Sequence, residues 1–135
     1  MKGIWRIKPV GDQALLVVFE QKIAEHVNAQ VMALDKRIRQ ERPKGVLETV
    51  PAFASILVYY DPMETETLQL MGVLEGMLRA DEVHASFQGK LIEIPVCYGG
   101  RYGEDLDFVA EHAGLSVREV IEIHSKRDYL IYMLG

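Results

Sequence analysis

The chain has 135 residues, 49% hydrophobic and 26% charged, with a formal net charge of −5 at pH 7. This length suffices for one domain with a hydrophobic core, which we expect to span residues 1–135. The acidic balance disfavours nucleic acid as a partner, and no apolar run approaches the ~20 residues of a membrane-spanning helix. The single cysteine and the lack of a signal-peptide pattern in the first residues predict a cytoplasmic location.

Two short strands and a long helix are predicted in the first third of the chain. Residues 4–8 alternate apolar and polar side chains, and residues 14–19 form a mostly apolar run, with Asp12 in the turn between them. From residue 22 to residue 42, apolar side chains recur every three or four positions, which predicts an amphipathic helix that Pro43 and Gly45 end. The apolar residues of this helix are Ile23, Val27, Val31, Leu34 and Ile38.

The middle of the chain is predicted to contain two strands, a helix and one more strand, which complete the order of elements of a known fold. The runs VLETV (46–50) and ASILVYY (54–60) predict two strands, residues 64–80 a helix, and KLIEIPVCY (90–98) another strand. Gly72 and Gly76 are expected to permit close packing of the helix on the sheet. From residue 14 to residue 97 the order is therefore that of the ferredoxin-like βαββαβ fold. The buried stripe of its second helix is predicted to be Leu68, Met71, Leu74 and Leu78.

Two short helices and a last strand are predicted to follow this core. Gly114 is expected to end the first helix, and Ser116 with Glu119 forms a capping box for the second, over residues 117–124. The run DYLIYMLG (128–135) reads as a final strand. The spacing of the two helices also fits a helix-turn-helix, but residues 104–124 carry six acidic side chains and a single arginine, which favours a packed hairpin over a DNA-binding unit. The predicted class is therefore α+β: a ferredoxin-like core with an added N-terminal strand, a short helical hairpin and a final strand.

The segment IPVCYGGRYG (94–103) is the main candidate for chemistry. Its glycines, Gly99, Gly100 and Gly103, lack the Lys-Ser/Thr of a nucleotide-binding P-loop and do not match a dinucleotide fingerprint. A turn that needs positive φ explains them without a ligand. A substrate contact remains an alternative, because Arg101 within the loop can meet an anion.

Three other polar residues have plain structural explanations beside functional ones. Cys97 is the only thiol in the chain, yet no nearby motif supplies the base that would activate it. His124 ends a predicted helix, where its cation favours the helix dipole, and Asp12 suits a tight turn. The histidines show no metal-ligand spacing, so no metal site is predicted.

Four segments of the chain resemble one family, in the same order. They are PVGDQALLVVF, VPAFASILVYYDP, IPVCYGGRYGEDLDFVAEHAGLSVREVIEIHS and YLIYMLG. Together they are similar to the family of the B subunit of 5-oxoprolinase, also known as KipI and as allophanate hydrolase subunit 1. The resemblance covers nearly the whole chain and is most specific from residue 94 onward.

The resemblance implies a function shared with other polypeptides. Members of the family are cytoplasmic bacterial proteins that act with the A and C subunits of 5-oxoprolinase to hydrolyse 5-oxoproline to glutamate with ATP. The implied chemistry is the opening of a cyclic amide after ATP activates its carbonyl as an acyl-phosphate-like species. This chain is expected to bind no cofactor itself, because ATP and Mg belong to the assembled complex. The alternative is the branch of the family that inhibits a sporulation-type sensor histidine kinase by direct binding.

The resemblance also implies an extent for the chain and a role for its glycine loop, and the proposed reaction suggests candidate site residues. Family members continue beyond YMLG into a cyclophilin-like β domain, so the chain corresponds to the N-terminal domain and is not expected to be active alone. Because YGGRYG matches a family motif, it is expected to lie at a site or a subunit interface. Under this reading His124 is a catalytic acid or base, and the residues that bind substrate are Asp12, Gly99, Gly100 and Arg101.

Overall fold

The computed structural model describes residues 4–80 and 89–134, which divide into two compact units. The first, called the sheet unit, comprises Met1–Gln88 with Ile131–Gly135, and the second, called the helical unit, comprises Gly89–Leu130. Each unit is described by itself. In the described part of the chain, no helix has the length and apolar character needed to span a membrane.

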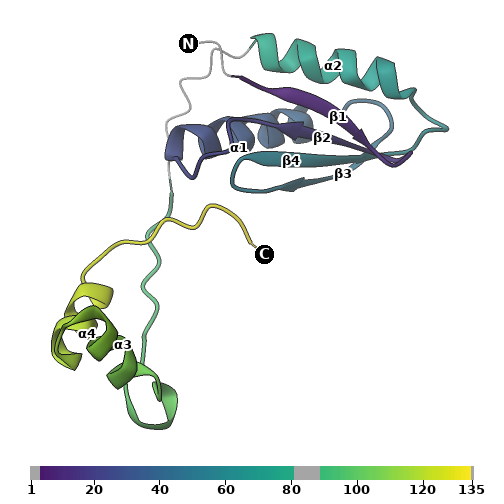
Figure 1. Cartoon of the computed structure of the whole chain (residues 1–135). Coiled ribbons are helices and arrows are strands. Elements are labelled where there is room, and N and C mark those ends of the chain that lie inside the picture. The colour runs from purple at the N-terminus through teal and green to yellow at the C-terminus, as the bar shows by residue number, and fades with distance from the viewer. Residues whose placement is uncertain (1–3, 81–88, 135) are drawn as a thin grey trace. The chain divides into compact units, whose positions relative to one another are not determined.

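The sheet unit contains a four-stranded antiparallel sheet (Figure 1). Its strands are β1 (Arg6–Val10), β2 (Ala14–Val18), β3 (Val46–Pro51) and β4 (Ser55–Tyr60), arranged in the order β1-β2-β4-β3. In the central pairing Leu16 lies opposite Leu57, and an irregularity between Val46 and Glu48 interrupts the register of the edge strand β3. Sheet and helices together confirm the predicted α+β class.

Two helices pack on one face of this sheet, and the hydrophobic core lies between the helices and the sheet. Helix α1 (Glu25–Glu41) ends as predicted, with Arg42 in the left-handed conformation and its N–H bonded to the carbonyl oxygen of Ile38 at 2.9 Å. Helix α2 spans Thr67–Ala80. Four of the five predicted apolar residues of the first helix are buried; Ile23 lies before the helix and is exposed. The buried core contains Leu15, Val17, Phe19, Val27, Val31, Leu34, Ile38, Ala54, Ile56, Val58, Tyr60, Leu70, Leu74 and Met77.

The buried stripe of α2 differs from the prediction in part. Leu74 is buried, and Met71 and Leu78 pack against the core partly buried, as predicted. Leu68, however, is 79% exposed. Because the helix begins at Thr67, the face that meets the core runs through Leu70, Leu74 and Met77. The predicted close packing at Gly72 and Gly76 is also wrong, since a Cβ added at either position meets no described atom within 4 Å.

The complete ferredoxin-like core is not confirmed. The order β2-β4-β3 matches the first three strands of that fold. The position beside β2, however, is occupied by β1, which pairs with β2 in a hairpin. Residues 90–98, predicted as the fourth strand, are not a strand in the structure. The physical reason is that a strand needs a ladder partner, and the edge of β2 is already paired.

The predicted final strand is also wrong. Residues 128–134 have no strand structure. The carbonyl oxygen of Tyr132 instead accepts a hydrogen bond from Nδ2 of the buried side chain of Asn28, at 3.1 Å. This segment is thus attached to the sheet unit by a side chain of α1 and not by a β ladder.

The helical unit confirms the predicted hairpin. A 3₁₀ turn (Gly100–Tyr102) precedes α3 (Leu106–Ala113) and α4 (Val117–Ser125). Gly114 ends α3 in the left-handed conformation, with φ of 67°. Both halves of the Ser116–Glu119 capping box are present at the start of α4. Among the described residues of this unit, the only buried hydrophobic side chain is that of Ala110.

Candidate functional site

The predicted site residues fall in both units. Asp12 lies in the turn between β1 and β2 of the sheet unit. Gly99, Gly100, Arg101 and His124 all lie in the helical unit. The site described below is therefore built from the helical unit alone, and the substrate-binding role of Asp12 stays a prediction.

Backbone geometry explains the glycines of the loop. Gly99 and Gly100 have φ of 81° and 54°, a region that side chains with a Cβ rarely adopt. Gly103 is required for a different reason, since a Cβ there would lie 2.8 Å from the backbone nitrogen of Gly99. The loop closes through hydrogen bonds from the Tyr102 and Gly103 N–H groups to the carbonyls of Gly99 and Gly100. The sequence YGGRYG therefore specifies a tight turn whose shape depends on three glycines.

This loop is connected to His124 through the tyrosine that precedes it. The Tyr98 hydroxyl lies 2.5 Å from Nδ1 of His124, although 26 positions separate the two residues in the sequence. Their rings meet edge to face at 5.7 Å, and the Tyr129 ring also lies near the imidazole, with 5.5 Å between the ring centres. We call Tyr98, His124 and Tyr129 the Tyr98–His124 cluster.

The arrangement of the cluster suits proton transfer. Because Nδ1 of His124 is held by the Tyr98 hydroxyl, the ring has a defined orientation, and Nε2 has no hydrogen-bond partner among the described residues. An imidazole held at one nitrogen and open at the other can take or give a proton at the open nitrogen. His124 is exposed, so a molecule or a partner surface can reach it.

The orientation of α4, which carries His124 in its last turn, is set at the other end of the helix. Glu119 accepts hydrogen bonds from the Ser116 hydroxyl and the Ser116 N–H, each at 2.7 Å. The side-chain bond, followed by the backbone bond, lowers the pKa of Glu119 from its ordinary value. The Ser116 hydroxyl in turn accepts a bond from the Glu119 N–H at 3.3 Å. A charged cap therefore begins the helix that presents His124.

Arg101 and Cys97 flank the loop without joining the cluster. The Arg101 guanidinium lies 4.6 Å from the centre of the Tyr102 ring and also donates to the Tyr102 hydroxyl. Both side chains are exposed, so an anion can reach Arg101 from solvent. Cys97 is exposed, and no described residue forms a hydrogen bond with its thiol. The anion contact of Arg101 stays a prediction.

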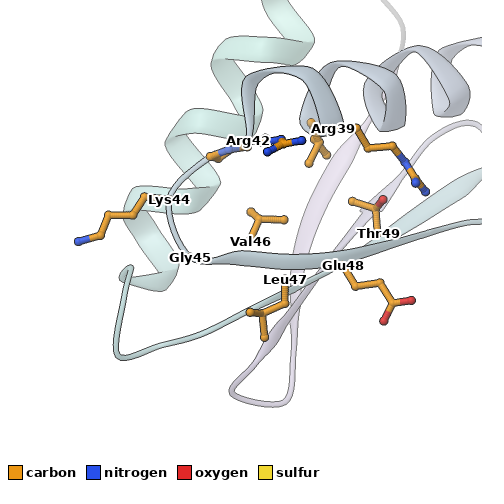
Figure 2. A pocket seen from close by; sticks show the side chains of 10 residues that line it. Arg39, Arg42, Lys44, Gly45, Val46, Leu47, Glu48 and Thr49 are labelled. Atoms are coloured by element: carbon orange, nitrogen blue, oxygen red, sulfur yellow. The ribbon is translucent and has the colours of Figure 1, made fainter.

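A basic hollow in the sheet unit is a second candidate. It has a volume of about 660 Å³ and lies between the end of α1 and the edge strand β3 (Figure 2). Arg39, Arg42 and Lys44 line it. The Arg39 Nε is held by the buried Asp35 carboxylate at 2.9 Å, and Lys44 pairs with Glu64 at 3.7 Å. Cations at the C-terminal end of a helix complement its dipole, so these charges need no ligand to explain them.

Sequence reasoning missed two of the three members of the cluster. Tyr98 lies within the segment IPVCYGGRYG without a signal of its own, and Tyr129 lies in the run that predicts a final strand. No periodicity links residue 98 to residue 124, because their contact depends on how the helical hairpin folds back. In the described residues, no group of three His, Cys, Asp or Glu side chains is arranged to hold a metal ion.

Comparison with known proteins identifies relatives along the whole chain. Residues 5–135 match the family described as carboxyltransferase domain, subdomain C and D. The chain is 36% identical over 141 residues to the B subunit of 5-oxoprolinase from Bacillus subtilis, covering 97% of this chain and 59% of that protein. It is 31% identical to the B subunit of 5-oxoprolinase from Escherichia coli O157:H7, covering 93% of this chain and 56% of that protein. The chain thus spans less than two thirds of the length of these relatives.

Solved structures agree with this assignment. A conserved uncharacterized protein of Pyrococcus horikoshii is 44% identical with a TM-score of 0.55, over 96% of this chain and 59% of that one. Urea amidolyase of K. lactis, at 15% identity, shares the fold with a TM-score of 0.75, over 99% of this chain and 9% of that one. The resemblance to the B subunit of 5-oxoprolinase that the sequence motifs indicated is confirmed. The chain belongs to the family of carboxyltransferase domains, subdomains C and D, and is a homologue of the B subunit of 5-oxoprolinase.

Proposed function

We propose that this chain is the N-terminal part of a 5-oxoprolinase component that takes part in ATP-dependent hydrolysis of 5-oxoproline to glutamate, together with the A and C subunits in the cytoplasm. The observation that carries the proposal is the 36% identity to the B subunit of 5-oxoprolinase over 97% of the chain. Identity that extends through both units supports a shared role more strongly than a match to one motif.

Apolar side chains at the start of the helical unit support a role within an assembly. Leu91, Ile92, Ile94 and Val96 are all exposed, with Leu91 at 75%. A run of exposed aliphatic side chains is typical of a surface that another polypeptide covers. Such a chain is expected to be inactive alone and to gain its function from its partners.

The charges beside the glycine loop disfavour a site for ATP and Mg at this loop. The glycine loop is followed by Glu104 and Asp105, whose negative charges disfavour phosphate at this position. The proposal therefore assigns the nucleotide and its metal to the partner polypeptides. What this chain supplies is contact with the lactam and its carboxylate.

Within this proposal each site residue has a chemical task. His124, oriented by Tyr98, transfers a proton at Nε2 during opening of the cyclic amide. Arg101 pairs with the carboxylate of 5-oxoproline. The turn at Gly99 and Gly100 brings backbone close to the substrate. The substrate-binding role of Asp12, in the sheet unit, stays a separate prediction.

Gene deletion tests the proposal directly. We would measure ADP release that depends on 5-oxoproline in extracts of the native host, with and without the gene. Loss of the activity on deletion, and its return with the full-length gene, is the expected result. Unchanged activity after deletion would overturn the proposal, and autophosphorylation of a histidine kinase would then be assayed.

Point variants test the site separately from the pathway. In the full-length gene, His124→Ala is expected to lower the restored activity about 100-fold or more, the usual range for loss of an acid–base group. Tyr98→Phe is expected to lower it less, because only the hydroxyl that orients the ring is lost. His112→Ala is the matched control, since His112 stacks on Phe108 in the same unit and lies outside the cluster. Equal activity of the His124 and His112 variants would contradict the assigned role.

A further inference from the structure

Within the described part of the sheet unit, α1 and α2 pack on only one face of the sheet. The core residues Leu15, Val17, Ile56 and Val58 lie on the face that α1 and α2 cover. The residues between them point to the opposite face, called here the open face. Figure 2 shows the two faces on β3, where Val46 and Thr49 point toward α1 while Leu47 and Glu48 point away from it. The two consecutive residues that point away mark the irregularity between Val46 and Glu48.

The open face is apolar in the middle and carries opposite charges at its two sides. The strand register places two rows of side chains across it, each in the order β1, β2, β4, β3. The first row is Lys8, Leu16, Leu57 and Val50. The second row is Val10, Ala14, Tyr59 and Glu48.

The apolar side chains of the open face differ in exposure: Leu16 and Leu57 are half-buried, and Ala14 is buried. Val10, Val50 and Tyr59 are between 40% and 46% exposed, and Leu47, next to the second row, is 70% exposed. Contiguous apolar patches of this kind usually mark interaction sites. The charges then indicate which partner fits, because the β1 side is basic and the β3 side is acidic.

We propose that the open face binds a second copy of the same chain, sheet against sheet, about a twofold axis parallel to the strands. Such an axis, passing between β2 and β4, places β1 of one copy over β3 of the other and β2 over β4. Because this axis keeps each row level with itself, Leu16 meets Leu57, and Lys8 lies over Val50 of the second copy, one row along the strand from Glu48. The side chains of two stacked sheets interdigitate at a spacing of about 10 Å.

Charge favours this arrangement. It brings the basic β1 side of one copy over the acidic β3 side of the other. The other in-plane twofold axis, perpendicular to the strands, would place β1 over β1 and bring Lys8 near Lys8. Because like charges across an interface are unfavourable, only the first axis makes the face self-complementary.

A charge exchange tests the inference. Sedimentation velocity of the 135-residue chain, run over a range of concentrations at about 0.15 M salt, is expected to show a reversible dimer. Lys8→Glu alone, or Glu48→Lys alone, is expected to weaken dimerisation about tenfold or more, since each places like charges together. The double variant, which restores opposite charges, is expected to regain it. Lys22→Glu and Glu20→Lys are controls that change net charge equally at exposed positions outside the strands.

The possible results decide for or against the proposed interface. Loss of the dimer in each single variant and its recovery in the double variant would support the interface and its axis. A chain that stays monomeric at every concentration would overturn the inference. So would a dimer to which the Lys8 and Glu48 variants are indifferent, because its interface would then lie elsewhere.

Discussion

At the scale of single residues, Asn28 joins three parts of the sheet unit. It is 1% exposed, and its Nδ2 donates to the carbonyl oxygens of Ala52, Phe53 and Tyr132 at 3.4, 3.3 and 3.1 Å. Two of these carbonyls belong to the turn between β3 and β4, and the third belongs to the C-terminal segment. A buried amide therefore replaces the strand pairing that the sequence predicted for that segment.

We predict that Asn28→Ala lowers the free energy of unfolding by about 1–3 kcal/mol, because buried acceptors lose their donor. Urea denaturation of the chain measures this change. Asn28→Asp keeps the size but removes the NH₂ group and faces carbonyl oxygens with a carboxylate, so it is expected to be at least as destabilising. A stable Asp variant would show that these hydrogen bonds contribute little.

A second residue-scale prediction concerns the pH dependence of α4. Since the folded-state pKa of Glu119 is lowered, the charged cap stabilises the helix above the unfolded pKa, and this stabilisation is lost as pH falls through the folded value. Ser116→Ala removes the largest cause and is expected to raise the pKa of Glu119 toward its ordinary value. An NMR titration of the Glu119 carboxyl measures this, with Ser125→Ala as the control. An unshifted titration in Ser116→Ala would show that the cap does not hold the carboxylate.

At the scale of elements, the turn from α1 into β3 depends on Gly45. This residue has φ of 82°, and a Cβ there would lie 2.6 Å from Cγ2 of Thr65. Gly45→Ala is expected to destabilise the chain by about 1–3 kcal/mol through backbone strain, with the clash adding to this. Gly72→Ala, in the open middle of α2, is expected to stabilise it by about 0.5–1 kcal/mol. Thermal melts of the two variants should therefore shift in opposite directions, and shifts of the same sign would contradict this account.

The burial pattern of α2 predicts unequal effects for two leucines of one helix. Leu74→Ala should cost about 2–5 kcal/mol, because the side chain lies fully in the core. Leu68→Ala, at an exposed position, should change stability by about 0.5 kcal/mol or less. Denaturant midpoints of the two variants measure the difference. Similar losses would instead support the stripe that periodicity alone predicted.

The sequence predicted where helices begin and end better than it predicted which strands pair with one another. Pro43 and Gly45 marked the end of α1, and Ser116 with Glu119 marked the start of α4, because capping and turn chemistry act within a few residues. Residues 90–98 were wrongly predicted because their apolar pattern suits a strand, while pairing is decided by whichever segment occupies the edge of β2. The Tyr98–His124 contact was unpredictable for the same reason, since it depends on tertiary folding across 26 positions.

At the scale of the whole molecule, the two units differ in how much core they contain. The sheet unit buries large side chains from strands and from both of its helices, whereas Ala110 alone is a buried hydrophobic residue in the described part of the helical unit. We therefore expect amides of α3 and α4 to exchange with solvent about tenfold or more faster than those of α1. Hydrogen exchange of the intact chain measures this. Equal protection in both units would mean that they unfold as one cooperative body.

The placement of β1 has a consequence for how the protein is made. In the ferredoxin-like order, the sheet is completed only by its last strand, which follows the second helix in the sequence. Here all four described strands lie between Arg6 and Tyr60, so the hydrogen-bonded sheet is encoded ahead of α2 and leaves the ribosome before it. The nascent chain can close its sheet while α2 and the helical unit are still being synthesised, and later segments then add to a scaffold that already exists.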